Sequence, residues 1–396
     1  MGVKRFKMTL VANQERLRRR TKIVCTLGPA SKSLDIVEAM LRAGMDIARL
    51  NLAHGTLAEH SQMIDTVRQL SQKHKLTTGI LVDLPGLKCS AGDMKEVFGQ
   101  HLQFALSQDA TFIALSFISS AHQVRKVREL LNELDTDIPI IVKIEKAGAL
   151  EGIDTILEAC EGIMVARGDL GLQIKIEKVP LAQKQLIKKA NHWGKPAITA
   201  TEMLESMVGS PTPTRAEAAD VANAVLDGTD ALMLSGETAI GKYPVEATET
   251  MARIALEAEA ALPYEQILYE RWQDVLPEVN DATARAACQI AHQVGARAIV
   301  TFTAGGTTAF RVSKYRPRQP IIAVTPSDNI LRRLSLAWGV TPVKRPEPLG
   351  LEEDFEQAAE VVMTAGIAGR GDLIIITAGF PLDVPGSTNL IKVHRI

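Results

Sequence analysis

The chain has 396 residues, a formal net charge of −1, 46% hydrophobic residues and 23% charged residues. This length exceeds what one hydrophobic core usually serves, so at least two domains are expected. The near-neutral charge argues against binding to nucleic acid or to an anionic membrane surface. No apolar run approaches the roughly 20 residues that span a bilayer. The four cysteines are too widely spaced for a zinc or disulfide framework, which predicts a cytoplasmic protein.

The first 20 residues are rich in arginine but lack the apolar core and cleavage site of a signal peptide. An organelle transit peptide would share this composition. We predict instead a short helical segment over residues 1–20.

Short apolar runs alternate with helical patterns over residues 21–262. Apolar residues recur at helical spacing in Asp35–Ala43, Ala121–Leu134 and Leu181–Asn191. Eight strands are predicted between such patterns: Thr21–Leu27, Ala48–Leu52, Gly79–Leu84, Phe112–Phe117, Pro139–Glu145, Gly162–Ala166, Pro196–Thr201 and Ala231–Ser235. Strands separated by helices imply parallel βαβ units, which form either a closed barrel or an open doubly wound sheet.

The positions of polar residues decide between these two folds. An open sheet gathers its site at one switch point, whereas a barrel brings the carboxyl ends of all its strands around one mouth. Here polar residues stand at the ends of many different strands: Arg49, Asn51, Asp83, Ser116, Lys143, Glu145, Asp169, Thr201 and Ser235. We therefore predict an α/β fold with a catalytic (β/α)8 TIM barrel over residues 21–262.

A second alternating region follows a polar, helix-prone stretch at Glu259–Asp274. Its pattern predicts a smaller α/β domain over residues 263–396. The expected elements are Ala284–Val294, Ala298–Phe302, Pro320–Val324, Gly339–Lys344, Phe355–Ala365, Asp372–Ile376 and Leu390–Val393.

Three charged residues of the predicted barrel suggest its chemistry. Lys143 and Glu145 are two residues apart on one strand and therefore point to the same face. They could form a plain ion pair at the rim, but a buried lysine is costly unless it meets an anion. A second carboxylate, Asp169, follows a strand in a glycine-containing turn that exposes backbone amides. Two carboxylates with open positions suit magnesium or manganese, and the lysine suits charge on a phosphoryl group and an enolate.

These residues lie in segments that resemble the pyruvate kinase family. The similar segments cover nearly the whole chain in order. They include Thr21–Ser31 (TKIVCTLGPAS), Ala43–Gly55, Ile141–Glu145, Gly162–Gly171, Ala200–Met207, Pro213–Glu217, Asp220–Thr238, Val312–Pro317, Pro320–Thr325 and Gly386–Asn389. The resemblance implies phosphoryl transfer from phosphoenolpyruvate to ADP, giving pyruvate and ATP, by a magnesium-dependent homotetramer whose second domain serves regulation and oligomerisation.

The resemblance also implies roles for individual residues. Glu145 and Asp169 match the magnesium ligands of the family. Lys143 matches the lysine that neutralises charge on the moving phosphoryl group and on the enolate. Arg49 matches an arginine that contacts the phosphoryl group.

The remaining matches concern the three-carbon acid. Its carboxylate would be received by the backbone of Ala166, Gly168 and Asp169. The hydroxyls of Thr201 and Ser235 would lie near the methylene carbon, where a water relay could protonate the enolate.

The chain departs from the family in the region that holds the nucleotide. Family members usually insert a small β-domain after the third strand, as a lid over the nucleotide. Here Asp83 ends that strand and the fourth begins near Phe112, which leaves about 28 residues for a helix and its connections. Ser90 also replaces a phosphate-contacting arginine. Without a lid we expect weak ADP binding, slow turnover or a different acceptor.

The potassium site of the family is altered as well. Asn51 and Asp83 match two of its ligands, but Ala53 and Leu84 replace the two hydroxyls. Lys88 stands where potassium-independent members carry a lysine, so the resemblance implies that potassium is not required. A solvated loop lysine is the alternative interpretation of Lys88.

A glycine-containing loop in the second domain resembles the family's effector loop. Hydroxyls and backbone amides in such a loop can cradle a phosphate, which predicts a sugar-phosphate effector. A plain glycine-rich turn is the alternative. The residues concerned are Thr303, Gly305, Gly306, Thr307 and Thr308.

Three hypotheses follow for the activity. The first is a potassium-independent pyruvate kinase without a lid. The second is a magnesium-dependent lyase or decarboxylase that acts on an oxaloacetate-like acid at the same enolate site. The third is a weakly catalytic protein that senses sugar phosphates. The retention of a complete set of site residues argues against it, namely Lys143, Glu145, Asp169, Arg49 and Thr201.

Overall fold

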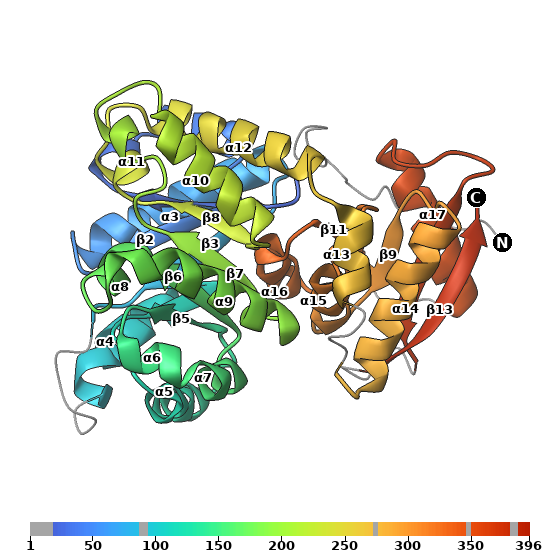
Figure 1. Cartoon of the computed structure of the whole chain (residues 1–396), viewed down its shortest axis with the longest axis horizontal. Helices are drawn as coiled ribbons and strands as arrows, with labels where there is room; N and C mark the ends of the chain where they lie inside the picture. The colour runs from blue at the N-terminus through green and yellow to red at the C-terminus, as the bar shows by residue number, and fades with distance from the viewer. Residues whose placement is uncertain (1–18, 87–93, 272–275, 346–349, 381–386) are drawn as a thin grey trace. The chain divides into compact units, whose positions relative to one another are not determined.

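A computed structural model describes residues 19–86, 94–271, 276–345, 350–380 and 387–396 of the chain (Figure 1). The predicted N-terminal helix and Lys88 lie outside these residues, apart from positions 19 and 20. The described chain divides into two compact units. One comprises residues 21–73 and 78–262, and the other comprises 19–20, 74–77 and the described part of 263–396. None of the described helices has the length and apolar character needed to cross a membrane.

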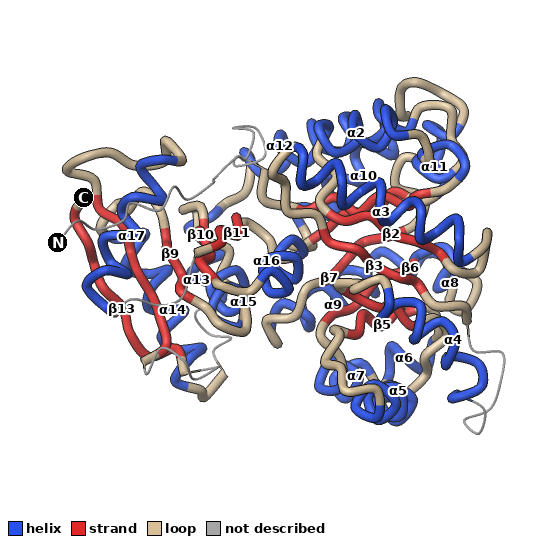
Figure 2. Tube along the Cα trace, turned by 180° about the vertical axis from the view of Figure 1, so that it is seen from behind, coloured by secondary structure: helices blue, strands red, loops and turns tan. Residues whose placement is uncertain are grey.

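The first unit is a closed barrel of eight parallel strands in chain order, which confirms the predicted fold. Helices surround the ring of strands, as Figure 2 shows. The strands are β1 (Lys22–Leu27), β2 (Ile47–Asn51), β3 (Gly79–Asp83), β4 (Phe112–Leu115), β5 (Ile140–Ile144), β6 (Gly162–Ala166), β7 (Ala197–Ala200) and β8 (Ala231–Leu234).

The strands are buried almost throughout because helices cover their outer face and side chains fill the barrel. Their runs of branched apolar residues stop where the chain reaches the mouth. There the parallel register sets polar residues of neighbouring strands beside one another, as with Asn51 and Asp83. The barrel thereby gathers residues that are far apart in sequence.

Helices connect the strands, and the predicted ones are present with small shifts of their ends. Ser33 caps the first of them, and Thr214 and Glu217 form a capping box on another. The helices around the barrel are α2 (Leu34–Ala43), α3 (Leu57–Lys73), α4 (Met94–Ser107), α5 (Ala121–Glu133), α6 (Ala147–Glu151), α7 (Ile153–Ala159), α9 (Val179–His192), α10 (Arg215–Leu226) and α12 (Pro244–Ala260).

Short helices shape the mouth of the barrel. At the carboxyl ends of β6 and β8 the chain turns at once into α8 (Arg167–Gly171) and α11 (Gly236–Ala239). Between β3 and α4 the chain has only residues 84–93. A connection of this length leaves no room for a lid domain at the place where the family usually carries one.

The second unit holds a five-stranded sheet in the order β11-β10-β9-β12-β13. Its last strand runs antiparallel and the others run parallel. One apolar cluster lies on each face of the sheet. The elements are α13 (Tyr264–Arg271), α14 (Val279–Gln293), β9 (Ile299–Phe302), α15 (Thr307–Lys314), β10 (Ile321–Thr325), α16 (Asp328–Arg333), β11 (Val340–Lys344), α17 (Leu351–Thr364), β12 (Leu373–Gly379) and β13 (Thr388–Arg395).

Candidate active site

Lys143 lies at the centre of a buried polar cluster at the end of β5. Its Nζ atom donates to Ser116 Oγ at 2.8 Å and lies 2.8 Å from Glu145 Oε1. It is also 3.4 Å from Asp83 Oδ2. The predicted common face of Lys143 and Glu145 is therefore present. The lysine meets two carboxylates and one hydroxyl, which compensates for the burial of its charge.

Asp83 at the end of β3 joins this cluster to Arg49 of β2. Arg49 Nε and Nη2 donate to Asp83 Oδ2 at 3.0 and 2.5 Å. Its Nη1 atom donates to Thr26 Oγ1 at 2.8 Å. Ser116 Oγ donates to the other carboxylate oxygen of Asp83 at 3.4 Å. Two cations thus share one buried carboxylate, which fixes their separation.

Glu145 is almost fully buried and is held at both carboxylate oxygens. Lys143 contacts Oε1, and the backbone N–H of Phe117 donates to Oε2 at 2.6 Å. Burial raises the pKa of Glu145, and the negative charge of Asp169 raises it further, while Lys143 and the Phe117 amide oppose the shift. Asp169 is half-buried in the first turn of α8.

The donor set fits a divalent cation of the magnesium type. Glu145 and Asp169 are close enough for their charges to interact, and carboxylate oxygens are the ligands that such hard cations prefer. Among the described residues no group of three or more His, Cys, Asp or Glu side chains could enclose a metal ion. A cation at Glu145 and Asp169 would accordingly need oxygens from a substrate or from water.

The ends of β6 and β7 meet at Thr201. Its Oγ1 atom accepts from the backbone N–H of Gly168 at 2.8 Å. Thr201 and Glu202 have φ angles of +66° and +54°, a left-handed conformation that is strained for a β-branched threonine. Arg167 supports this turn by donating to the carbonyl of Thr201 at 2.6 Å. Sequence reasoning missed this role of Arg167, although the residue lies directly between Ala166 and Gly168.

Ser235 follows β8 and is held in place by Glu237. The Glu237 carboxylate accepts from the backbone N–H of Ser235 at 2.7 Å and from that of Leu204 at 3.0 Å. Burial raises the pKa of Glu237, and these backbone hydrogen bonds oppose the shift. Glu237 thus ties the turn after β8 to the turn after β7. Sequence reasoning missed this residue, because nothing in its local pattern indicates burial.

Replacing Glu237 with glutamine is expected to destabilise the barrel by about 1–3 kcal/mol, because the amide NH2 would face a backbone N–H that has lost its acceptor. The free energy of unfolding in urea would measure the change. Glu257→Gln, at an exposed position on α12, is the control and should leave that free energy unchanged. Equal stability of the two variants would contradict the role of Glu237 in joining the turns after β7 and β8.

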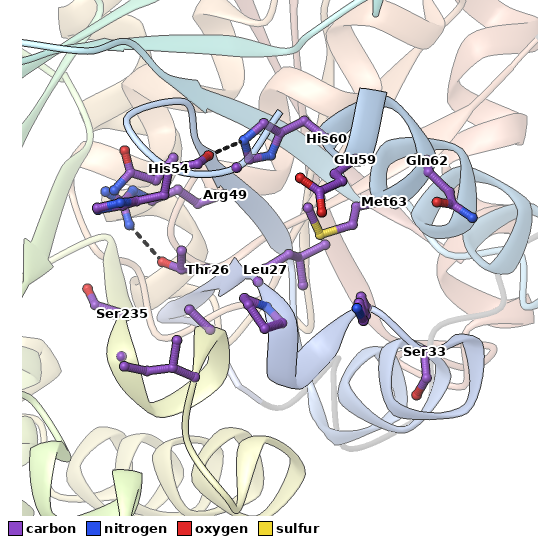
Figure 3. A pocket seen from close by; sticks show the side chains of 18 residues that line it. Thr26, Leu27, Ser33, Arg49, His54, Glu59, His60, Gln62, Met63 and Ser235 are labelled. Atoms are coloured by element: carbon purple, nitrogen blue, oxygen red, sulfur yellow. Dashed lines mark hydrogen bonds between the residues drawn. The ribbon is translucent and has the colours of Figure 1, made fainter. Parts of the chain in front are cut away.

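A pocket of about 870 Å³ opens beside this cluster. It is lined by residues that follow β1 and β2, by the start of α3 and by the turn at Ser235 and Gly236. Figure 3 shows Arg49 and Thr26 at one end of the pocket, Gln62 toward the other and Met63 between them. Arg49 contributes a positive charge at one end, and Lys32 and Glu59 also line the pocket. No local sequence pattern indicates this pocket.

The two described residues of the altered potassium site are adjacent. Asn51 and Asp83 pair in register on β2 and β3, and Asn51 Oδ1 accepts from the backbone N–H of Ala53 at 3.2 Å. The Asp83 carboxylate is already occupied by Arg49 and Lys143.

The predicted effector loop lies between β9 and α15 in the second unit. Thr303 Oγ1 accepts from the backbone N–H of Gly306 at 2.9 Å, and Gly306 has a φ of +85°. Thr308 and Thr388 share a hydrogen bond of 2.6 Å between their hydroxyls. The loop is therefore adjacent to Thr388 of the predicted motif, which lies 80 residues after Thr308 in the sequence. Gly305 and Thr307 complete the loop, and the glycine is exposed.

Comparison with known proteins agrees with this architecture. The family model described as "Pyruvate kinase, barrel domain" matches residues 18–100 and 82–248, two stretches that overlap at the short β3–α4 connection. The model described as "Pyruvate kinase, alpha/beta domain" matches residues 281–394.

Individual relatives extend the match to 96% of the chain. The chain is 38% identical to a pyruvate kinase of Geobacillus stearothermophilus, with 96% of this chain and 81% of the relative aligned. It is 37% identical to a pyruvate kinase of Sporosarcina psychrophila, over 96% and 80% of the two chains. The first alignment runs over 474 positions, so that relative has residues for which this chain of 396 has no counterpart. The chain belongs to the pyruvate kinase family, as a member without a lid domain.

Proposed function

We propose that the protein transfers the phosphoryl group of phosphoenolpyruvate to ADP, giving pyruvate and ATP. One observation carries this proposal. Arg49 belongs both to the Lys143 cluster and to the wall of the 870 Å³ pocket, so a ligand in that pocket would lie beside the proposed phosphoryl site. A lyase would not need a second pocket of this size next to its enolate site.

The chain's own residues would divide the chemistry among them. Lys143 would neutralise the charge that grows on the phosphoryl group and on the enolate oxygen. Its ammonium group is already held at the barrel mouth by Ser116 and Glu145. Arg49 would contact the phosphoryl group from the side of the pocket. Glu145 and Asp169 would hold Mg²⁺ or Mn²⁺, which supplies charge neutralisation when it is bound.

The acid itself would bind at the turn after β6. The backbone of Ala166, Gly168 and Asp169 would receive its carboxylate. Thr201 and Ser235 would lie near the methylene carbon and support the proton relay. The Gly168 N–H now donates to Thr201 Oγ1, so the turn after β6 already offers this amide to an oxygen acceptor beside the hydroxyl, and a bound carboxylate would take the place of Thr201 as its acceptor.

We also propose that potassium is not required. The Asp83 carboxylate has two protein cations within 3.4 Å, Arg49 and Lys143. The chain also has Ala53 and Leu84 where the family's potassium site has two hydroxyls, so a monovalent ion would find fewer oxygen ligands here. This explanation does not depend on Lys88, whose position is not described.

A second proposal concerns the oligomer and the effector. Three large apolar side chains on and before α9 are 62–83% exposed, namely Leu172, Ile176 and Leu181. Such a group suits a contact with another copy of the chain, which supports the expected homotetramer. The loop between β9 and α15 supports a sugar-phosphate effector, because Gly305 is exposed at its tip.

Pyruvate formation from phosphoenolpyruvate tests the proposed function. We expect product only when ADP and magnesium are both present, and the same rate with and without potassium. The ADP concentration for half-maximal rate should be high, because no lid closes over the pocket. Release of pyruvate from oxaloacetate without nucleotide, together with no ADP-dependent product, would establish the lyase alternative instead.

A further inference from the structure

We propose that Phe117 is a positioning residue that couples the β3–α4 connection to Glu145, and that the coupling depends on Gly86. The inference rests on the metal site of the proposed function. It concerns the part of the chain in which this protein departs from its lid-bearing relatives.

The backbone of Phe117 is held in an unfavourable conformation directly beside the metal site. Its φ angle is +59°, in the left-handed region that is rare for a bulky residue. This conformation directs the backbone N–H to Glu145 Oε2 at 2.6 Å. With Lys143 on Oε1, the carboxylate is fixed in one orientation. Strain of this kind persists only where surrounding contacts enforce it.

The ring of Phe117 provides those contacts. A Cβ atom built on Gly86 would lie 2.1 Å and 2.2 Å from two carbon atoms of the ring, so any larger residue there would displace the ring. Lys146 Nζ lies 5.7 Å from the centre of the ring. The ring is packed between the connection and this lysine, although 37% of the residue is exposed.

The chain therefore contacts the site both at the end of β3 and in the connection that follows. Asp83, the last residue of β3, holds Arg49 and Lys143 directly. Gly86 packs on the ring of Phe117, whose amide holds Glu145. A change at Gly86 would move the ring, rotate the Phe117 peptide and release one oxygen of the metal ligand. Residues that orient a ligand from outside the metal's own coordination typically change metal affinity about 10- to 100-fold.

The test is the affinity for Mn²⁺ of the full-length protein, measured by electron paramagnetic resonance without substrate. We expect Gly86→Ala to raise the dissociation constant at least about tenfold. The φ of Gly86 is not in the left-handed region, so alanine changes the contact and not the backbone preference. Gly99→Ala is the matched control, because a Cβ there meets nothing within 4 Å. It should bind Mn²⁺ as the wild type does.

Two substitutions of Phe117 complete the design. Phe117→Tyr keeps the ring and should bind like the wild type, whereas Phe117→Leu should weaken binding as Gly86→Ala does. If circular dichroism shows that Gly86→Ala is unfolded, the tenfold rise in the Mn²⁺ dissociation constant is instead required of Phe117→Leu. Wild-type affinity in the folded variants would overturn the inference. A wild-type protein that binds no Mn²⁺ would overturn the proposed metal site, and this inference with it.

Discussion

Replacing Lys143 with methionine is expected to lower the rate of ADP-dependent pyruvate formation at least about a thousandfold. Methionine keeps the length of the side chain but removes the charge that lies 2.8 Å from Glu145 and 3.4 Å from Asp83. The loss should appear in kcat, because the charge on the enolate oxygen develops only as the phosphoryl group leaves. A coupled assay for pyruvate measures it.

Two controls separate chemistry from folding. Lys184→Met removes an exposed lysine that pairs with Asp227 on the outside of the barrel, and should leave the rate unchanged. Circular dichroism should show that Lys143→Met is folded. A folded Lys143→Met protein with at least a tenth of the wild-type rate would refute the catalytic role of Lys143.

Replacing Asp281 with alanine is expected to destabilise the second unit by about 3–5 kcal/mol, because it leaves a buried lysine without its partner. Asp281 is fully buried and accepts from Lys314 Nζ at 2.9 Å, from Tyr315 Oη at 2.7 Å and from the backbone N–H of Leu276 at 2.8 Å. Chemical unfolding monitored by circular dichroism measures the change. Asp328→Ala, in an exposed pair with Lys344, should cost less than about 1 kcal/mol.

Asp281 should also make the stability of the second unit depend on pH. Burial acts to raise the pKa of Asp281, but the hydrogen bonds and charge from Lys314 and Tyr315 outweigh it, so the pKa is lowered. A carboxylate with a lowered pKa in the folded state stabilises the fold above its unfolded pKa and loses this contribution as the pH falls. The difference in stability between wild type and Asp281→Ala should therefore shrink in acid. A difference that is constant with pH would contradict this assignment.

The barrel could be predicted from the sequence because its strands are continuous apolar runs that end in polar residues. The pair of Lys143 and Glu145 followed from strand periodicity alone. The helix α16 was not predicted, since a helix of Asp328–Arg333 is too short to show a period. Arg167 and Glu237 were missed for another reason. Their partners lie on neighbouring turns of the barrel, and no local pattern records which turns will meet.

The pocket illustrates the same limit. Its wall combines the ends of β1 and β2 with a turn more than 170 residues later, at Ser235. Each segment alone has an ordinary composition. The enolate half of the site was visible in the sequence because two of its residues lie on one strand. The half beside the pocket exists only once the barrel has closed and joined β8 to β1.

The short connection of residues 84–93 also bears on what limits the speed of a catalytic cycle. In enzymes that close a domain over their substrates, the opening of that domain often determines how fast products leave. Here no lid domain has to open between one turnover and the next. Products would leave the barrel mouth without waiting for a domain to open, so release should be fast compared with chemistry and solvent viscosity should have little effect on the rate. The chemical step itself would then govern the pace of the enzyme.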